Sequence, residues 1–134
     1  MHIQINVPPG ELCDRITILQ IKMDRITDEQ KLVHVHTDLM QSLAVLEVLR
    51  CQTDEAHWDQ LIPLIAKLRE LNQRIWDIED NIRGLEKLRD FGDDFVQTAR
   101  SVYYTNDKRA NVKRQINDLF GSDIKEEKSY TDYV

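Results

Sequence analysis

The stretch LRELNQRIWDIEDNIRGLE, residues 68 to 86, decides the fold of this chain. Its apolar side chains recur at steps of three and four residues, which is the spacing of one face of an α-helix. These residues are Leu68, Leu71, Ile75, Ile78, Ile82 and Leu85. The pattern predicts one helix from a cap at Thr53 and Asp54 to about Asp90, about 36 residues and roughly 50 Å long. Pro63 is expected to kink this helix or to mark a later start.

Further helices are expected on both sides of the long helix, because the same spacing recurs before and after it. They cover residues 11–26, 28–50, 93–104 and 105–121. Between the third and fourth helices, Gly92 is expected to supply a left-handed residue and Asp93 or Asp94 a cap. Thr105 or Asn106 is expected to cap a fifth helix. The expected fold is all-α, an antiparallel bundle of four to five helices with one long central helix.

Both ends of the chain are expected to lie outside the helices. Residues 2–7 alternate apolar and polar side chains, which predicts a short N-terminal strand ended by Pro8 and Pro9. The polar residues 122–134 are expected to form an extended C-terminal tail. Length predicts a single helical domain, residues 1–134. A helix as long as the central one outreaches a small bundle, so its uncovered apolar face predicts a homodimer.

Charge and composition restrict the function. A net charge of −6 gives no basic field that would bind nucleic acid or an anionic membrane surface. No export or membrane segment is expected, because the longest apolar run, Leu43 to Leu49, is interrupted by Glu47. Cys13 and Cys51 lie far apart without a CxxC spacing. They predict reduced thiols and a cytoplasmic location.

A second row of side chains, which we call the polar seam, runs beside the apolar face of the long helix. It consists of Asn72, Trp76, Glu79, Arg83 and Glu86. Glu79 lies near the centre of the combined face, where a buried carboxylate needs a cationic or donor partner. The candidate partners from later helices are Arg100, Arg109 and Lys113. Either the seam binds a ligand, or Asn72 fixes the register of the helices while Glu79 pairs with Arg83.

The first helix carries a secondary charged cluster beside its apolar stripe. It consists of Glu11, Asp14, Arg15 and Lys22, with Arg25 adjoining. The plainest interpretation is a ladder of exposed helical ion pairs, each contributing about 0.3–0.5 kcal/mol. The alternative is that these residues belong to a site.

Metal or cofactor chemistry is not predicted. The acids Glu11 and Asp14, and likewise Asp77, Glu79 and Asp80, could in principle hold Mg²⁺, but such clusters usually belong to solvated faces. The four histidines lack the HExxH spacing of zinc sites. Neither a glycine-rich phosphate loop nor a serine nucleophile elbow is present.

Short strings spread over nearly the whole chain are specific as a set. They are Gly10-Glu11-Leu12 with Asp14, Ile16 to Leu19 and Ile21-Lys22; Glu70-Leu71-Asn72 with Trp76, Glu79-Asp80 and Arg83; Ala99-Arg100 with Val102-Tyr103; Asn106-Asp107, Arg109-Ala110, Lys113 and Ile116-Asn117; and Glu126 to Tyr130. Together they resemble a family of small bacterial domains of unknown function, found alone or attached to glycosyltransferase-like or repeat-containing proteins. The resemblance implies a bacterial, cytoplasmic protein linked to surface-carbohydrate metabolism, and implies no activity and no catalytic residues.

Three functions compete at this point. The leading hypothesis is a non-catalytic module that binds a small anionic ligand or a partner protein through the polar seam. The second is a small all-α enzyme, either metal-dependent and pyrophosphohydrolase-like or mutase-like, since residues 68–80 faintly resemble a helix of the all-α chorismate mutases in fold alone. Its site would use Glu79 with Arg83, Arg100, Arg109 and Lys113. The third is a pure oligomerisation scaffold.

Overall fold

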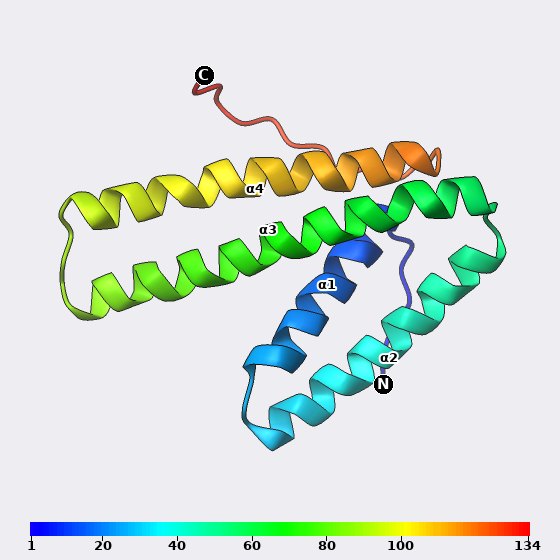
Figure 1. Ribbon diagram of the computed structural model, residues 1–134, viewed down its shortest axis with the longest axis horizontal. Coiled ribbons are helices and arrows are strands. Elements are labelled where there is room, and N and C mark those ends of the chain that lie inside the picture. The colour runs from blue at the N-terminus through cyan, green and yellow to red at the C-terminus, as the bar shows by residue number, and fades with distance from the viewer.

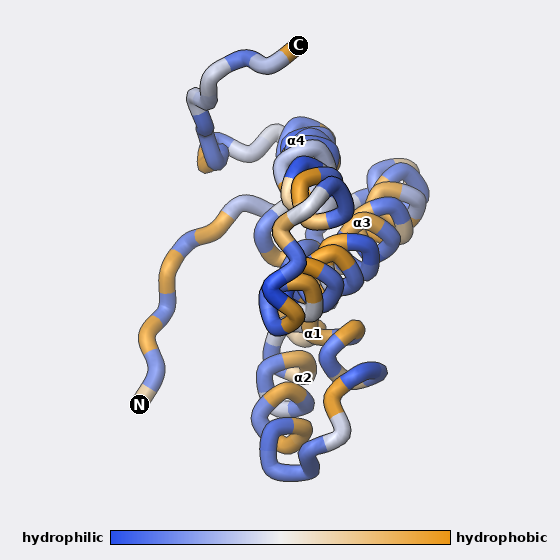
Figure 2. Tube along the Cα trace, turned by 90° about the vertical axis from the view of Figure 1, so that its left-hand side faces the viewer, coloured by the Kyte–Doolittle hydropathy of each residue, from blue (hydrophilic) through white to orange (hydrophobic).

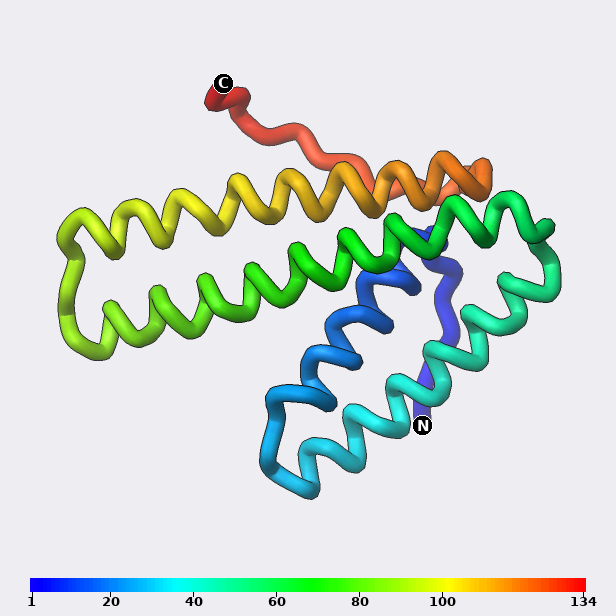
Figure 3. Tube along the Cα trace, viewed as in Figure 1, coloured from blue at the N-terminus to red at the C-terminus, as the bar shows by residue number.

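The computed structural model describes residues 1–134 and contains four α-helices joined by short loops (Figure 1). They are α1 (Pro9–Arg25), α2 (Glu29–Cys51), α3 (Glu55–Lys87) and α4 (Asp93–Leu119). The helices α3 and α4 form a long antiparallel pair, and α1 and α2 form a shorter hairpin beside one half of it (Figure 3). The all-α bundle with one long helix, predicted from the sequence, is confirmed.

Local chemistry sets the start of α2 and of α3. Asp28 caps α2 by accepting a hydrogen bond from the backbone N–H of Lys31 at 3.0 Å. Asp54 caps α3 in the same way, with the N–H of His57 at 2.8 Å. Since α3 already begins at Glu55, Pro63 lies inside the helix and the later start is wrong.

The core is built around α1, which packs against each of the other three helices. One buried cluster joins α1 to α3 and α4 through Cys13, Leu61, Leu68, Leu71, Val112 and Ile116. A second joins α1 to α2 through Leu12, Ile16, Leu19 and Leu39. Both clusters lie at the end of the α3–α4 pair where the hairpin packs, so the other end has no comparable core.

The N-terminal strand predicted from the sequence is absent. Residues 1–8 form neither strand nor helix, and they extend away from the helices (Figure 2). The side chains of Ile3 and Ile5 are 84% and 75% exposed. Alternation describes the two faces that a strand would have, but a strand also needs a neighbour for its backbone groups. In an all-helical chain no sheet edge supplies one.

The predicted fifth helix is also wrong, because α4 continues through Thr105 and Asn106 without a break. Cap residues permit a helix start but do not impose one, and no glycine or proline interrupts α4. The helix ends at Leu119, and Gly121 just beyond it terminates the helix as expected, with a left-handed φ of 60°. The backbone N–H of Ser122 donates to the carbonyl of Asn117 at 3.0 Å, as in a glycine-terminated helix.

The turn between α3 and α4 corrects one further expectation. The left-handed residue is Arg89, with φ 53°, and not Gly92, whose φ is −76°. The N–H of Asp90 donates to the carbonyl of Leu85 at 3.0 Å, so the helix terminates in the usual glycine geometry with an arginine in the glycine position. No helix of the molecule combines the length and the apolar character needed to cross a membrane.

Candidate functional site

A buried polar cluster lies where α1, α3 and α4 meet, and Asn72 of α3 is its centre. The side chain is 5% exposed. Its amide nitrogen donates to Asp14 Oδ1 at 2.8 Å and to Thr17 Oγ1 at 2.9 Å, both on α1. Its amide oxygen accepts from Arg109 Nη1 of α4 at 3.2 Å. Asn72 thereby links three helices and holds the Arg109 guanidinium in place.

Beside this cluster the polar seam borders a groove of about 330 Å³ between α1, α3 and α4. Its lining includes Asn72, Trp76, Glu79, Asp80, Arg83 and Arg109, together with Lys22, Ile18 and Ile75. Glu79 forms an ion pair with Arg83 one turn along α3, and its side chain is 41% exposed. Of the four cations expected as possible partners of Glu79, only Arg83 pairs with it, because the carboxylate is half exposed and directed along its own helix. The alternative of a Glu79–Arg83 pair is thus the one observed, and Arg100, Arg109 and Lys113 do not pair with Glu79.

Two cations of the groove have no ion-pair partner. Neither Lys22 nor Arg109 has a carboxylate oxygen within 4.0 Å, the distance limit of the ion pairs found in this structure. Arg109 instead donates to the neutral amide of Asn72. Trp76 borders the same groove, and the Arg25 guanidinium lies 5.8 Å from the centre of its ring. The groove thus combines unneutralised positive charge with an aromatic and aliphatic wall.

Lys113 belongs to a neighbouring cluster and not to the groove. Its ammonium lies 2.8 Å from Glu11 of α1, 2.8 Å from Glu126 of the tail and 3.9 Å from Asp14. Burial lowers the pKa of Lys113, but hydrogen bonds to Glu11 and Glu126 outweigh it and the net pKa is raised. Hydrogen bonding from Lys113 lowers the pKa of Glu126. The charge of Lys113 is therefore already balanced by carboxylates, and this side chain links α1, α4 and the tail.

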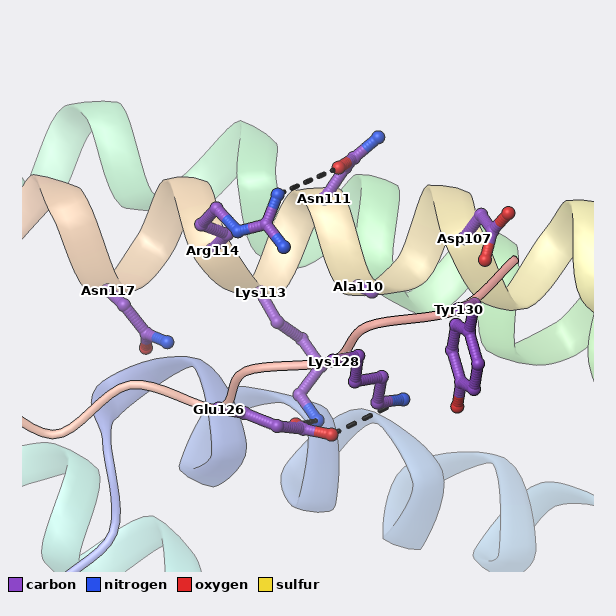
Figure 4. A pocket seen from close by; sticks show the side chains of 9 residues that line it. All are labelled: Asp107, Ala110, Asn111, Lys113, Arg114, Asn117, Glu126, Lys128 and Tyr130. Atoms are coloured by element: carbon purple, nitrogen blue, oxygen red, sulfur yellow. Dashed lines mark hydrogen bonds and ion pairs between the residues drawn. The ribbon is translucent and has the colours of Figure 1, made fainter. Parts of the chain in front are cut away.

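The tail forms one side of a second, smaller pocket. Figure 4 shows Lys113 extending from α4 towards Glu126, which Lys128 also approaches, at 3.3 Å. Tyr130 lies farther along the tail, beside Asp107 of α4 (Figure 4). The pocket measures about 260 Å³. Since the carboxylate of Glu126 already neutralises its most buried cation, this pocket is less suited to an anion than the groove.

The first turn of α1 is held against α4 by a close backbone contact. The N–H of Gly10 donates to Asn117 Oδ1 at 2.7 Å. A Cβ atom at Gly10 would lie 2.5 Å from the carbonyl oxygen of Lys113, which is closer than real Cβ contacts come. Only glycine fits there, and the contact fixes how α1 presents Asp14, Thr17 and Lys22 to the other helices.

The structure brings together five of the seven candidate site residues. Asn72, Trp76, Glu79, Arg83 and Arg109 share the groove, Lys113 lies in the adjacent cluster, and Arg100 lies apart. Arg100 is exposed and donates to Gln97 on its own helix at 3.1 Å.

The charges of α1 pair mainly between helices and not in the expected ladder. Arg15 binds Asp38 of α2 at 2.6 Å, and Arg25 pairs with Asp77 of α3. Lys22, which the sequence placed in the secondary cluster, joins the groove. Sequence reasoning assigned no role to Thr17 or Glu126. The only signal for either residue was its place in a string shared with the resembled family, Ile16 to Leu19 for Thr17 and Glu126 to Tyr130 for Glu126.

Nucleophilic chemistry has no evident residue here. Cys13 is fully buried, and burial raises the pKa of its thiol to about 12, which keeps it protonated. No group of three or more His, Cys, Asp or Glu side chains is arranged to hold a metal ion. What the groove offers chemically is recognition of negative charge beside an aromatic ring.

These features define the class of the protein, a four-helix domain with a buried polar cluster and an interhelical groove. The chain belongs to DUF6165, a family of unknown function, which matches residues 1–134. The resemblance to a domain family of unknown function is thereby confirmed. No curated protein and no solved structure gives a significant match to the chain.

Proposed function

We propose that the domain binds a small anionic ligand in the groove between α1, α3 and α4, without catalysing a reaction. The observation that carries this proposal is the pair of cations, Lys22 and Arg109, that border the groove without a carboxylate partner. The other cations without an ion-pair partner are exposed to solvent, whereas Lys22 and Arg109 are half-buried, so water compensates their charge less fully. A carboxylate or phosphate group is the natural complement.

The shape and lining of the groove restrict the ligand further. A volume of about 330 Å³ suits a small molecule and not a peptide or a nucleic acid. Ile18, Ile75 and Trp76 offer an apolar surface beside the cations. Glu79 and Asp80 at the same groove disfavour a polyanion because like charges repel. The ligand class we expect carries one or two negative charges on an apolar or aromatic body.

The direct test is calorimetric titration with inorganic phosphate and with benzoate, an anion with an aromatic body. Benzoate is expected to bind more tightly. Arg109→Gln and Lys22→Gln should each weaken binding about tenfold or more, which corresponds to about 1.4 kcal/mol. Lys108→Gln is the matched control, since Lys108 is an exposed cation next to Arg109 that does not line the groove. Equal losses in all three variants would show that only net charge matters and would contradict the proposal.

The competing functions make different predictions in the same titration. A pure scaffold fits the pairing of Glu79 with Arg83 and predicts that neither anion binds, whereas the half-buried Lys22 and Arg109 beside the seam favour a ligand. A small enzyme would need turnover of the bound anion, which product analysis after the titration detects. A bacterial, cytoplasmic setting linked to surface-carbohydrate metabolism is proposed from the family resemblance, and the homodimer stays a prediction.

A further inference from the structure

The outer arm, residues 73–104, is the half of the α3–α4 pair that extends beyond the α1–α2 hairpin (Figure 1, Figure 3). None of its residues is buried. In contrast, the inner halves of the same two helices contribute Leu61, Leu68, Leu71, Val112 and Ile116 to the core. The contrast has a simple cause, because α1 covers the inner halves but reaches only the base of the arm, where Arg25 pairs with Asp77.

The outer arm nevertheless carries a row of apolar side chains along both of its helices. Its inward-facing apolar residues are only half-buried, namely Ile75, Ile78, Ile82, Leu85, Phe95 and Val102. Leu88, Phe91 and Val96 are 76%, 54% and 46% exposed. Two helices in contact shield only one side of each other, so a stripe of this width needs further helices to cover it.

We propose that the outer arm of a second copy covers this surface, so that two arms form an antiparallel four-helix bundle. Charge decides the direction of the pairing. The tip, residues 86–94, carries four acids against the two bases Lys87 and Arg89, and none of these side chains has an ion-pair partner within 4.0 Å. An antiparallel pair separates the two tips, whereas a parallel pair would place two net-acidic tips together.

The size of the surface agrees with a specific but modest dimer. Sixteen residues of helix span roughly 25 Å, and two neighbouring helices are roughly 20 Å wide. Each copy would then contribute on the order of 500 Å², or about 1,000 Å² in total, which reaches the lower bound for a biological interface. We therefore expect a dimer that forms at micromolar concentrations.

Sedimentation equilibrium of the full chain at micromolar concentrations tests the interface. The wild type is expected at twice the monomer mass of 15.8 kDa. Leu88→Glu combined with Val96→Glu should give the monomer, because both side chains are exposed in one copy and are covered in the dimer. Val48→Glu on α2, a site 57% exposed, is the matched control and should stay dimeric. Circular dichroism verifies that the variants remain helical.

The direction of the pairing is tested by distance. A spin label at Asp90→Cys, in a Cys51→Ser background that leaves only the buried Cys13, reports the separation of the two tips. An antiparallel pair should separate the labels by about one arm length, roughly 25 Å, and a parallel pair by about one helix spacing, roughly 10 Å.

Three results would overturn the proposal: a monomeric wild type, a double variant that is still a dimer, or spin labels at the two tips that are only about 10 Å apart. Titration of the double variant with benzoate keeps this test separate from that of the ligand, because Lys22 and Arg109 are unchanged in it.

Discussion

At the residue scale, Asn72 joins three helices with a single neutral amide. It faces Asp14, Thr17 and Arg109 at once, and each partner would lose a hydrogen bond if the amide were removed. A carboxylate in its place would lie against Asp14, and an apolar side chain would leave Asp14 and Arg109 without their bridge. The amide is the one group of this size that donates to the acid and accepts from the cation.

Asn72→Ala is therefore expected to lower the free energy of unfolding by about 2–3 kcal/mol, because buried polar groups are left without partners. Asn81→Ala is the control, since Asn81 lies on the same helix and makes one exposed hydrogen bond to Thr98. It should cost less than about 1 kcal/mol. Urea denaturation of both variants measures the difference. A loss at Asn72 no larger than that at Asn81 would mean that water replaces the amide and that the cluster is not closed.

The contact between Lys113 and Glu126 gives a pH dependence. The pKa of Glu126 is lowered from 4.5, so its contribution to docking the tail is complete above 4.5 and is lost as the pH falls through the lowered value. The pKa of Lys113 is raised from 10.5, so its contribution is complete below 10.5 and is lost as the pH rises through the raised value. Carbon-13 NMR of the Glu126 carboxylate should show its titration moving up towards 4.5 in Lys113→Met. Lys128→Gln, which removes the more distant cation, should move it less. An unchanged titration in Lys113→Met would contradict the contact.

At the scale of the element, the turn after α3 holds an arginine where glycine is the usual residue. Arg89 has a φ of 53°, a conformation that costs a side-chain-bearing residue about 1 kcal/mol. Arg89→Gly should therefore stabilise the protein by about 0.5–1 kcal/mol, and Lys87→Gly, inside the last turn of α3, should destabilise it by a similar amount. Thermal unfolding of the two variants gives the comparison. Melting temperatures that shift in the same direction would contradict the left-handed turn.

The helices could be predicted from the sequence because their cause is local. The steps of three and four from Leu68 to Leu85, and the caps at Asp28 and Asp54, need only the chain itself. The wrong predictions have two kinds of cause. A structure can depend on a neighbouring element, and a residue can allow a conformation without requiring it. Alternation in residues 2–7 predicts a strand only if a neighbouring edge exists. Thr105 is a cap residue by type, yet it is 4% exposed within α4, where packing decides its conformation.

At the scale of the whole molecule, the site could be predicted only in part. Spacing along α3 places Asn72, Trp76 and Glu79 in one row, and the structure keeps that row. The spacing of residues along one helix does not predict how far another helix is rotated or shifted relative to it. That rotation decides which cations reach the row on α3. It brings in Lys22 and Arg109 and leaves Arg100 outside. The rotation of α1 depends on a backbone contact at Gly10, which no periodicity reveals.

The effect of that contact on the whole molecule is testable with two glycines. A Cβ atom at Gly10 would lie 2.5 Å from the Lys113 carbonyl oxygen and 2.7 Å from Asn117 Oδ1, whereas a Cβ atom at Gly84 of α3 would meet nothing within 4 Å. Gly84→Ala should therefore stabilise the protein by about 0.5–1 kcal/mol through helix propensity alone.

Gly10→Ala gains the same propensity but forces α1 away from α4, and a net loss of about 1–3 kcal/mol is expected. Because α1 carries Asp14, Thr17 and Lys22, its displacement should also weaken benzoate binding, although Gly10 does not line the groove. Denaturation and calorimetry on the two variants measure both effects. If Gly10→Ala were as stable as Gly84→Ala, α1 and α4 would not be in close contact. If Gly10→Ala were destabilised but bound benzoate normally, the position of α1 would not control the groove.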